Sequence, residues 1–220
     1  GANSELHLVD ERIVGRMPAS LSFAEAAALP LTAITAWELL FERLQITQGN
    51  TDLGQSLLIV GAAGGVGSIL VQLARQLTGL TVIGTASRPE TQAWVRELGA
   101  HHVIDHRQPL SEELKRIGIN QVTHVASLTQ TDQHFAQLVE ALAPQGRLAL
   151  IDDPEQPLDI MQLKRKSLSL HWELMFTRSL FETADMIEQH RLLDRVAELV
   201  DAGTLRTTLG EHFGSINATN

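Results

Sequence analysis

The sequence contains no cysteine among its 220 residues. Disulfide bridges, thiolate metal ligands and cysteine nucleophiles are therefore excluded within this chain. A chain without cysteine fits a reducing compartment, and the first residues lack the basic start and apolar run of a secretory signal. We therefore expect a cytoplasmic location.

Long apolar runs and basic clusters are also lacking. No stretch approaches the ~20 consecutive apolar residues that a membrane helix needs. The formal net charge is −9, and the basic run at 164–166 is short. Membrane and nucleic-acid partners are therefore disfavoured. An acidic protein that binds an anionic ligand must supply local positive potential through backbone N–H groups and a few placed cations.

Short apolar runs alternate with helical patterns from about residue 55 onward. Such alternation predicts right-handed crossovers and a parallel sheet with helices on both faces, which is a doubly wound α/β fold of the Rossmann type. The expected strands are 57–60, 81–83, 102–104, 122–126 and 147–151, and the expected helices are 66–77, 89–98, 111–117 and 132–142, with Ser111 as the N-cap of the third helix.

The segments on either side of this core also carry patterns. Ser22 and Glu25 have the spacing of a capping box that opens a helix, and Pro30 separates that helix from a second one. Residues 5–14 have the pattern of a strand without a partner in the core. After the core, 167–174 alternates like a strand, and a long helix is expected over 183–200. Residues 215–220 resemble the beginning of another helix.

A glycine-rich turn joins the first expected strand to the first core helix. Gly64 would let the backbone approach a pyrophosphate, and Gly67 would let the helix pack closely against the strand. Free N–H groups at the helix start would then meet the phosphate charge at the positive end of the helix dipole. The common G-x-G-x-x-G pattern has Ala62 in its first position here, beside Gly61. The expected dinucleotide-binding residues of this turn are Ala62, Ala63, Gly64, Gly65, Val66 and Gly67.

The end of the second expected strand indicates which dinucleotide binds. NAD enzymes place an acid there, about 20 residues after the turn, to bind the ribose hydroxyls. This sequence has Thr85, Ser87 and Arg88, and no acid occurs before Glu90. A guanidinium suits a 2′-phosphate by charge and by bidentate geometry. The sequence therefore predicts NADP rather than NAD.

Six stretches of the chain together resemble the zinc-type alcohol dehydrogenase-like, quinone-oxidoreductase-related family of the medium-chain dehydrogenase/reductase superfamily. The stretches are 9–15, 21–37, 61–67, 97–106, 143–147 and 174–178. The resemblance implies a two-domain enzyme that transfers hydride from NADPH to a quinone, an enone or a related carbonyl compound. It also implies that a GroES-like catalytic domain is mostly absent. Residues 1–29 would be its end and the connecting segment, 30–178 the NADP-binding domain, and 179–220 a truncated return toward the catalytic domain.

The resemblance also carries over individual positions. Thr32 lies where relatives approach the nicotinamide, and His106 where relatives often have a tyrosine near the adenine phosphate. Ser127 and Thr129 would border the adenosine ribose, although turn hydroxyls of this kind also bind only their own backbone. Ile151, followed by Asp152, would border the nicotinamide. Ligands of doubly wound sheets collect at these carboxyl ends.

The family's name refers to zinc, but we find no zinc ligands in this sequence. True zinc alcohol dehydrogenases have a cysteine ligand in the region that corresponds to 29–32, where this chain has neither sulfur nor imidazole. His101, His102 and His106 lie in a strand and loop pattern, where spacing by four does not align ligands. We therefore expect no metal site in this chain. Two alternatives stay open: a zinc alcohol dehydrogenase whose ligands all lie outside this chain, and an NADPH-binding protein without turnover.

Two further expectations concern catalysis and assembly. No catalytic residue is assigned, because catalytic groups of the other domain are not visible in this sequence. The strand at 167–174 would form an edge of the sheet, and an exposed edge invites pairing. Relatives continue the sheet across a two-fold axis through this strand, so we expect a homodimer.

Overall fold

The computed structural model describes residues 4–49, 51, 54–211 and 214. Its centre is a six-stranded sheet in the order β3-β2-β1-β4-β5-β6, in which all neighbouring strands are parallel. The strands are β1 (Ser56–Val60), β2 (Thr81–Thr85), β3 (His102–Ile104), β4 (Val122–Ser127), β5 (Leu142–Leu150) and β6 (Ser169–Trp172). This order is that of a Rossmann fold, so the predicted fold class is confirmed.

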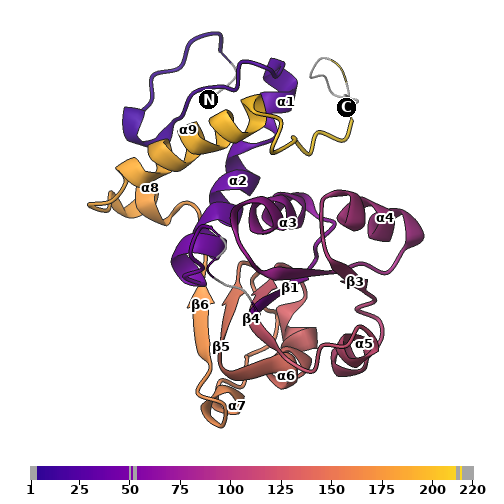
Figure 1. The fold of residues 1–220 in the computed structure, drawn as a ribbon. Helices are drawn as coiled ribbons and strands as arrows, with labels where there is room; N and C mark the ends of the chain where they lie inside the picture. The colour runs from indigo at the N-terminus through magenta and orange to yellow at the C-terminus, as the bar shows by residue number, and fades with distance from the viewer. Residues whose placement is uncertain (1–3, 50, 52–53, 212–213, 215–220) are drawn as a thin grey trace.

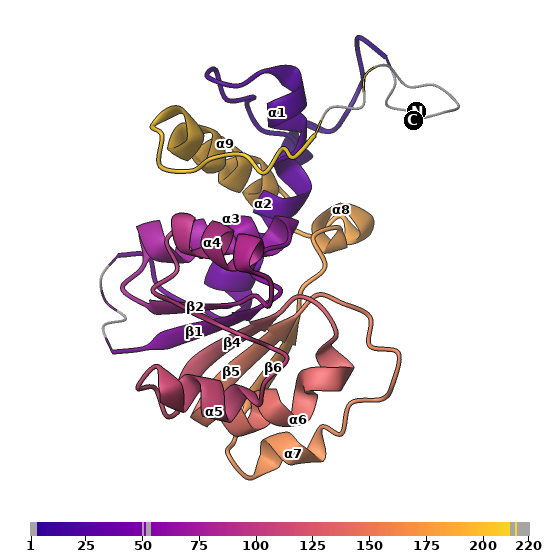
Figure 2. The same cartoon turned by 90° about the vertical axis from the view of Figure 1, so that its right-hand side faces the viewer.

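Helices cover both faces of the sheet (Figure 2). On one face lie α3 (Gly65–Leu77) and α4 (Pro89–Glu97), and on the other lie α5 (Leu110–Arg116), α6 (Thr131–Ala141) and the short α7 (Met161–Lys164). Strand β1 shows why both faces must be covered, because all its residues are buried. Leu57 and Ile59 belong to the apolar cluster beneath α3, whereas Leu58 and Val60 belong to the cluster beneath α5 and α6.

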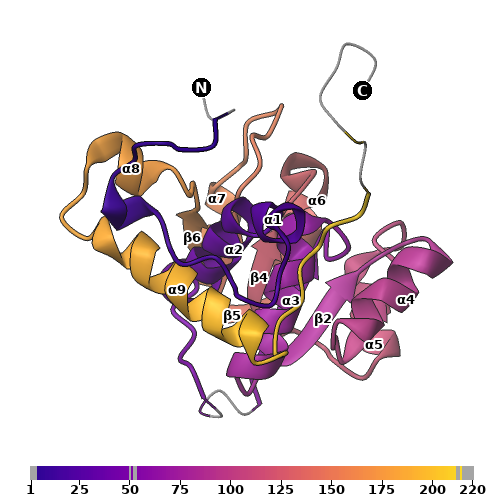
Figure 3. The same ribbon diagram turned by 90° about the horizontal axis from the view of Figure 1, so that it is seen from above.

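The N-terminal elements and the last helix meet on the side of α3 that faces away from the sheet (Figure 1). There α9 (Ile187–Asp201) packs against α2 (Pro30–Trp37), which in turn packs against α3. The remaining elements are η1 (Glu11–Ile13), α1 (Phe23–Ala27), the π-helix η2 (Glu38–Arg43) and α8 (Thr177–Phe181). Figure 3 shows α9 crossing α2 beside the N-terminal segment. No helix among the described residues is long and apolar enough to cross a membrane.

Local sequence features explain where two of these helices begin: a capping box at α1 and a proline at α2. The predicted capping box is confirmed: the N–H of Ser22 donates to Glu25 Oε2 over 2.8 Å, and the N–H of Glu25 donates to Ser22 Oγ over 3.4 Å. Pro30 occupies the first position of α2, where its missing N–H costs nothing.

Several sequence-based expectations differ from the structure. The strand expected over 5–14 is wrong: a strand needs a neighbour to bind, and this exposed segment instead forms the η1 turn, in which Asp10 accepts a hydrogen bond from the N–H of Arg12. Ser111 is not an N-cap, because α5 already begins at Leu110 after Pro109. The last long helix begins at 187 rather than 183. The expected helix start at 215–220 lies outside the described residues, and the division into domains stays a prediction.

Candidate functional site: the carboxyl edge of the sheet

The ligand-binding position of a doubly wound sheet is the crevice where the strand order reverses. Here that point lies between β1 and β4, because the chain proceeds from β1 to β2 and β3 on one side, and from β4 to β5 and β6 on the other. Val60 and Ser127, the last residues of β1 and β4, lie side by side in register. The loops that follow these two strands therefore border one site.

The glycine turn, residues 61–67, leads from β1 into α3. It begins with Gly61 at φ +82°, a left-handed conformation that suits glycine, and the N–H of Gly64 closes the turn onto the carbonyl of Gly61 over 3.1 Å. Gly64 is the N-cap, and the first intrahelical bond is donated by Ser68. The N–H groups of Gly65, Val66 and Gly67 therefore precede any intrahelical acceptor and are available to an anion. Gly64 and Gly65 are exposed.

The buried residues of the turn explain its close packing. A Cβ on Gly67 would lie 2.4 Å from the carbonyl oxygen of Gly61 and 2.7 Å from the backbone of Ala62, so this position accepts only glycine. Ala62 is fully buried. Gly67 and Ala62 are thus the buried, closely packed part of the turn. Its outer surface is formed by the exposed Gly64 and Gly65 and by the half-buried Ala63 and Val66.

Thr32 and Thr85 lie on opposite sides of the glycine turn. Thr32 is half-buried on α2, and its methyl group would lie 3.1 Å from a Cβ on Gly65, so the structure brings it to the exposed part of the turn. Thr85 is only 2% exposed, and its hydroxyl accepts a hydrogen bond from the N–H of Gly61 over 3.2 Å. The structure therefore places Thr85 as a support of the turn.

The predicted residues at the ends of β4 and β5 also fall into two groups, one buried and one more exposed. Ser127 is fully buried, and its hydroxyl is 2.7 Å from that of Thr131. Asp152 accepts hydrogen bonds from the backbone N–H and the hydroxyl of Thr131 at the start of α6. Thr129 is exposed, with its methyl group 3.1 Å from a Cβ built on Gly61, and Ile151 is half-buried. Thr129 thus lies against the glycine turn, Ile151 packs against the apolar cluster beneath α3, and Ser127 supports the loop.

Four residues lie at the carboxyl ends of β2 and β3, and we call them the adenosine corner after the ligand that the sequence predicts there: Ser87, Arg88, His106 and Arg107. Arg88 is exposed at the start of α4, and its guanidinium makes no ion pair with any residue that the structure describes. Arg107, which the sequence reasoning missed, donates from Nη2 to the carbonyl of Ser87 over 3.0 Å. Its signal was a basic residue directly after His106.

The histidines that could suggest a metal have other partners. His101 Nδ1 accepts a hydrogen bond from the N–H of Val82 over 3.0 Å, which ties the start of β3 to β2. His106 is half-buried and contacts His134 edge to face, with ring centroids 6.2 Å apart. Within 4–49, 51, 54–211 and 214, no three His, Asp or Glu side chains form a group that could hold a metal ion. The described residues therefore do not fit a zinc site, and we derive no step through zinc.

A separate apolar groove of about 340 Å³ lies away from the glycine turn. It is formed by the segment from η1 to the start of α2 and by one side of α9, including Leu193 and Val196. Phe23, at its border, is 85% exposed. The groove contains no cluster of polar groups, so we assign no chemistry to it.

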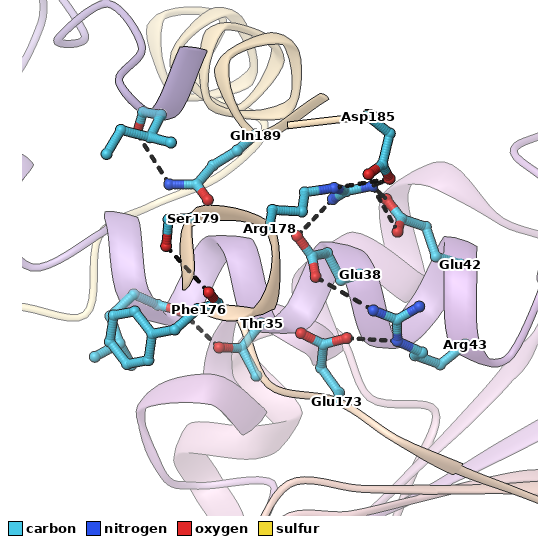
Figure 4. Close-up of polar contacts among 12 residues, drawn as sticks. Thr35, Glu38, Glu42, Arg43, Glu173, Phe176, Arg178, Ser179, Asp185 and Gln189 are labelled. Atoms are coloured by element: carbon cyan, nitrogen blue, oxygen red, sulfur yellow. Dashed lines mark hydrogen bonds and ion pairs between the residues drawn. The ribbon is translucent and has the colours of Figure 1, made fainter. Parts of the chain in front are cut away.

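Six charged side chains form what we call the buried charge cluster, which joins η2 to the segment after β6 (Figure 4). Arg178 donates to Glu38 over 2.6 Å, and Arg43 donates to Glu173 over 2.7 Å. The two arginines also share Glu38, since Arg43 Nη2 lies 3.7 Å from its other oxygen. The cluster consists of Glu38, Glu42, Arg43, Glu173, Arg178 and Asp185.

Four carboxyl groups and two arginines make the buried charge cluster rich in acid. Glu38 is 1% exposed, and burial, together with the hydrogen bond and the charge of Glu173, raises its pKa to about 8. Burial also raises the pKa of Glu173. Glu173 Oε1 is buried and has no hydrogen-bond partner among the described residues, and a proton on the neighbouring Glu38 carboxyl would supply the missing donor. At neutral pH the two carboxyl groups therefore share one proton.

The strand order and the glycine turn define the class: a Rossmann-type α/β domain. The sequence matches the zinc-binding dehydrogenase family over residues 65–195, and the chain belongs to that family. It is 36% identical to a zinc-type alcohol dehydrogenase-like protein of Staphylococcus aureus strain MRSA252, an alignment that covers 100% of this chain and 66% of the relative. The chain thus spans about two thirds of the length of such relatives.

Two solved structures illustrate the same relationship. A protein from Rhizobium etli CFN 42, assigned to the zinc-dependent alcohol dehydrogenases, is 59% identical with a TM-score of 0.91, over 97% of this chain and 62% of that one. Escherichia coli quinone oxidoreductase complexed with NADPH is 25% identical with a TM-score of 0.75, over 88% of this chain and 58% of that one. The relationship predicted from the sequence is confirmed.

Proposed function

We propose that the protein is an NADPH-dependent oxidoreductase that reduces a quinone, an enone or a related carbonyl compound. The glycine turn carries this proposal, because its exposed amides at the head of α3 suit a diphosphate. The NADPH preference is supported by the exposed Arg88 and by the absence of an acid from the end of β2 to Ser87. The resemblance to a quinone oxidoreductase complexed with NADPH supports the substrate class.

In this proposal the residues of the chain bind and orient the cofactor. The N–H groups of Gly65 and Val66 bind the diphosphate, while Arg88 binds the 2′-phosphate. Thr32 and Ile151 border the nicotinamide end from α2 and from the end of β5. When bound, NADPH supplies the hydride, and the protein's task is to hold it against an electrophilic substrate.

Cofactor titration tests the proposal first. We expect the complete protein to bind NADPH more tightly than NADH. Arg88→Ala should weaken NADPH binding about tenfold, or ~1.4 kcal/mol, and leave NADH binding nearly unchanged, since one charge-assisted contact is lost. Arg195→Ala, which removes an exposed arginine from α9, is the matched control. Equal affinities for NADPH and NADH in the unmodified protein would overturn the NADPH preference.

A substrate panel tests the reaction class. NADPH oxidation by the complete protein should be faster with quinones or enones than with simple aldehydes. If only alcohol oxidation is observed, and zinc is found in stoichiometric amounts, the zinc alcohol dehydrogenase alternative is correct. Normal NADPH binding with no turnover of any substrate would instead favour a binding protein.

We also propose that the protein forms a homodimer through β6. This strand pairs on one side with β5 and on its other side with no described strand. Trp172, its last residue, is 52% exposed, as is Leu174 just beyond it. An unpaired, partly apolar edge favours pairing with a second copy. Light scattering should give a dimer at micromolar concentration and a monomer for Trp172→Glu. A monomeric unmodified protein would contradict the proposal.

A further inference from the structure

Arg107 is held in one orientation by four hydrogen bonds, three to the carboxylate of Asp105 and one to the carbonyl of Ser87. Its Nε and Nη2 donate to the two carboxylate oxygens of Asp105, the shortest contact being 2.7 Å, and Nη2 also donates to the carbonyl of Ser87 over 3.0 Å. The hydrogen bonds from Arg107 hold the pKa of Asp105 below its usual range, so this carboxyl group is ionised at neutral pH. An exposed arginine usually samples many rotamers, whereas this one is already ordered.

The contacts leave part of the guanidinium free. Arginine has five N–H donors, one on Nε and two on each terminal nitrogen. Nε and both donors of Nη2 are used by Asp105 and Ser87, so the two donors of Nη1 remain for a ligand. Arg107 is 64% exposed, which allows a ligand to reach Nη1.

The position of Arg107 relates these free donors to the cofactor. Ser87 is the residue before Arg88, and its carbonyl is the group that Arg107 binds. Strands β2 and β3 are paired up to Thr85 and Ile104, and the N–H of Ala86 donates to the carbonyl of Ile104, so the two following loops lie side by side. The Arg107 guanidinium is therefore bound to the residue directly before Arg88, in a chain whose net charge is −9.

We propose that Arg107 is a second determinant of cofactor specificity, which binds the 2′-phosphate of the nucleotide through Nη1 while Asp105 and Ser87 hold it in place. The inference rests on the proposed NADPH preference and extends it to the loop after β3. Asp105 offsets one positive charge, and Arg88 and Arg107 together still leave the corner positive by one unit. A dianionic phosphate is thus attracted, whereas a ribose hydroxyl gains little.

Adenosine 2′,5′-bisphosphate and adenosine 5′-monophosphate test this directly, because they differ only in the 2′-phosphate. Calorimetric titration of the complete protein should give a clear preference for the bisphosphate. Arg107→Ala should reduce that preference about five- to tenfold, chiefly by lowering the affinity for the bisphosphate. Such a change is expected for the loss of one charge-assisted contact at an exposed site. Arg107→Lys, which keeps the charge, should retain part of the preference, and Arg195→Ala should retain all of it.

The possible results separate this inference from the proposed function. If the unmodified protein prefers the bisphosphate and Arg107→Ala keeps the full preference, Arg107 has no such role, although the NADPH proposal stands. If Arg107→Ala lowers the affinity for both nucleotides equally, the residue only supports the loop, and the inference is again wrong. If the unmodified protein shows no preference, the NADPH proposal itself fails.

Discussion

The adenosine corner and the buried charge cluster both place arginines beyond the carboxyl ends of strands, but their charges have different partners. In the cluster, Arg178 is 6% exposed and its guanidinium binds three carboxylates of the same chain. In the corner, Arg88 is exposed, and Arg107 keeps two donors free. Charges that satisfy one another stabilise a fold, whereas charges that are held but left partly unpaired are available to a ligand. The same residue type thus serves structure in one region and, in our proposal, recognition in the other.

The largest expected effect comes from removing a cation from the buried charge cluster. Arg178→Ala removes the guanidinium that binds Glu38, Glu42 and Asp185 and leaves this acid-rich cluster with one cation, which should cost ~3–5 kcal/mol of unfolding free energy. Urea unfolding followed by circular dichroism measures this change. Arg195→Ala, which breaks an exposed pair with Glu198, should cost ~0–1 kcal/mol. A loss below about 1 kcal/mol for Arg178→Ala would remove the contrast between the two regions.

A smaller loss of stability, with a larger loss of binding, is expected at the glycine turn. In Gly67→Ala the new methyl group would meet the backbone of Gly61 and Ala62, so the turn must shift, at a cost of ~1–3 kcal/mol. NADPH affinity should fall more steeply, because the amides of the turn move with it. Gly210→Ala is the control, since a Cβ there meets nothing within 4 Å. Unchanged NADPH affinity in a stable Gly67→Ala protein would count against the turn as the diphosphate site.

The smallest expected effect is the pH dependence of the unfolding free energy. The folded pKa of Glu38, about 8, lies above its ordinary value of 4.5, so the folded state binds more protons between these values. Stability from this group is therefore complete below pH 4.5 and decreases as the pH rises toward 8. In Glu38→Gln, which keeps the shape and a donor for Glu173, this decrease should be weaker. Unfolding free energies measured from pH 5 to pH 9 decide the matter, and identical pH profiles of the two proteins would refute the shared proton.

The parts of the fold that were predictable are those in which local pattern and long-range packing agree. The run from Leu57 to Leu77 combines a buried strand, a glycine turn and an amphipathic helix, and these three consecutive patterns all agree with the same βα unit. Residues 5–14 have a strand pattern as well, but a strand forms only with a neighbour, which the pattern cannot supply. Ser111 is a good capping residue that lies one position inside the helix it was expected to begin.

The geometry of the candidate site was predictable where it depends on the local backbone, and less so where side chains that are distant in the sequence meet. The exposed amides after Gly64 follow from a local motif. Thr85 and Ser127 lie at the expected strand ends, yet their hydroxyl groups are buried, and sequence spacing does not reveal the direction of a side chain. The pairing of Glu38 with Arg178 spans 140 positions, and the contact of Arg107 with Ser87 depends on how two loops lie together. Such contacts become visible only in three dimensions.

A structure of the complete protein with NADPH bound is the most direct measurement of the central claim. We expect diphosphate oxygens within hydrogen-bonding distance of the backbone nitrogens of Gly65 and Val66, with the 2′-phosphate beside Arg88. A nucleotide bound elsewhere, with the turn between β1 and α3 in contact with water alone, would contradict it.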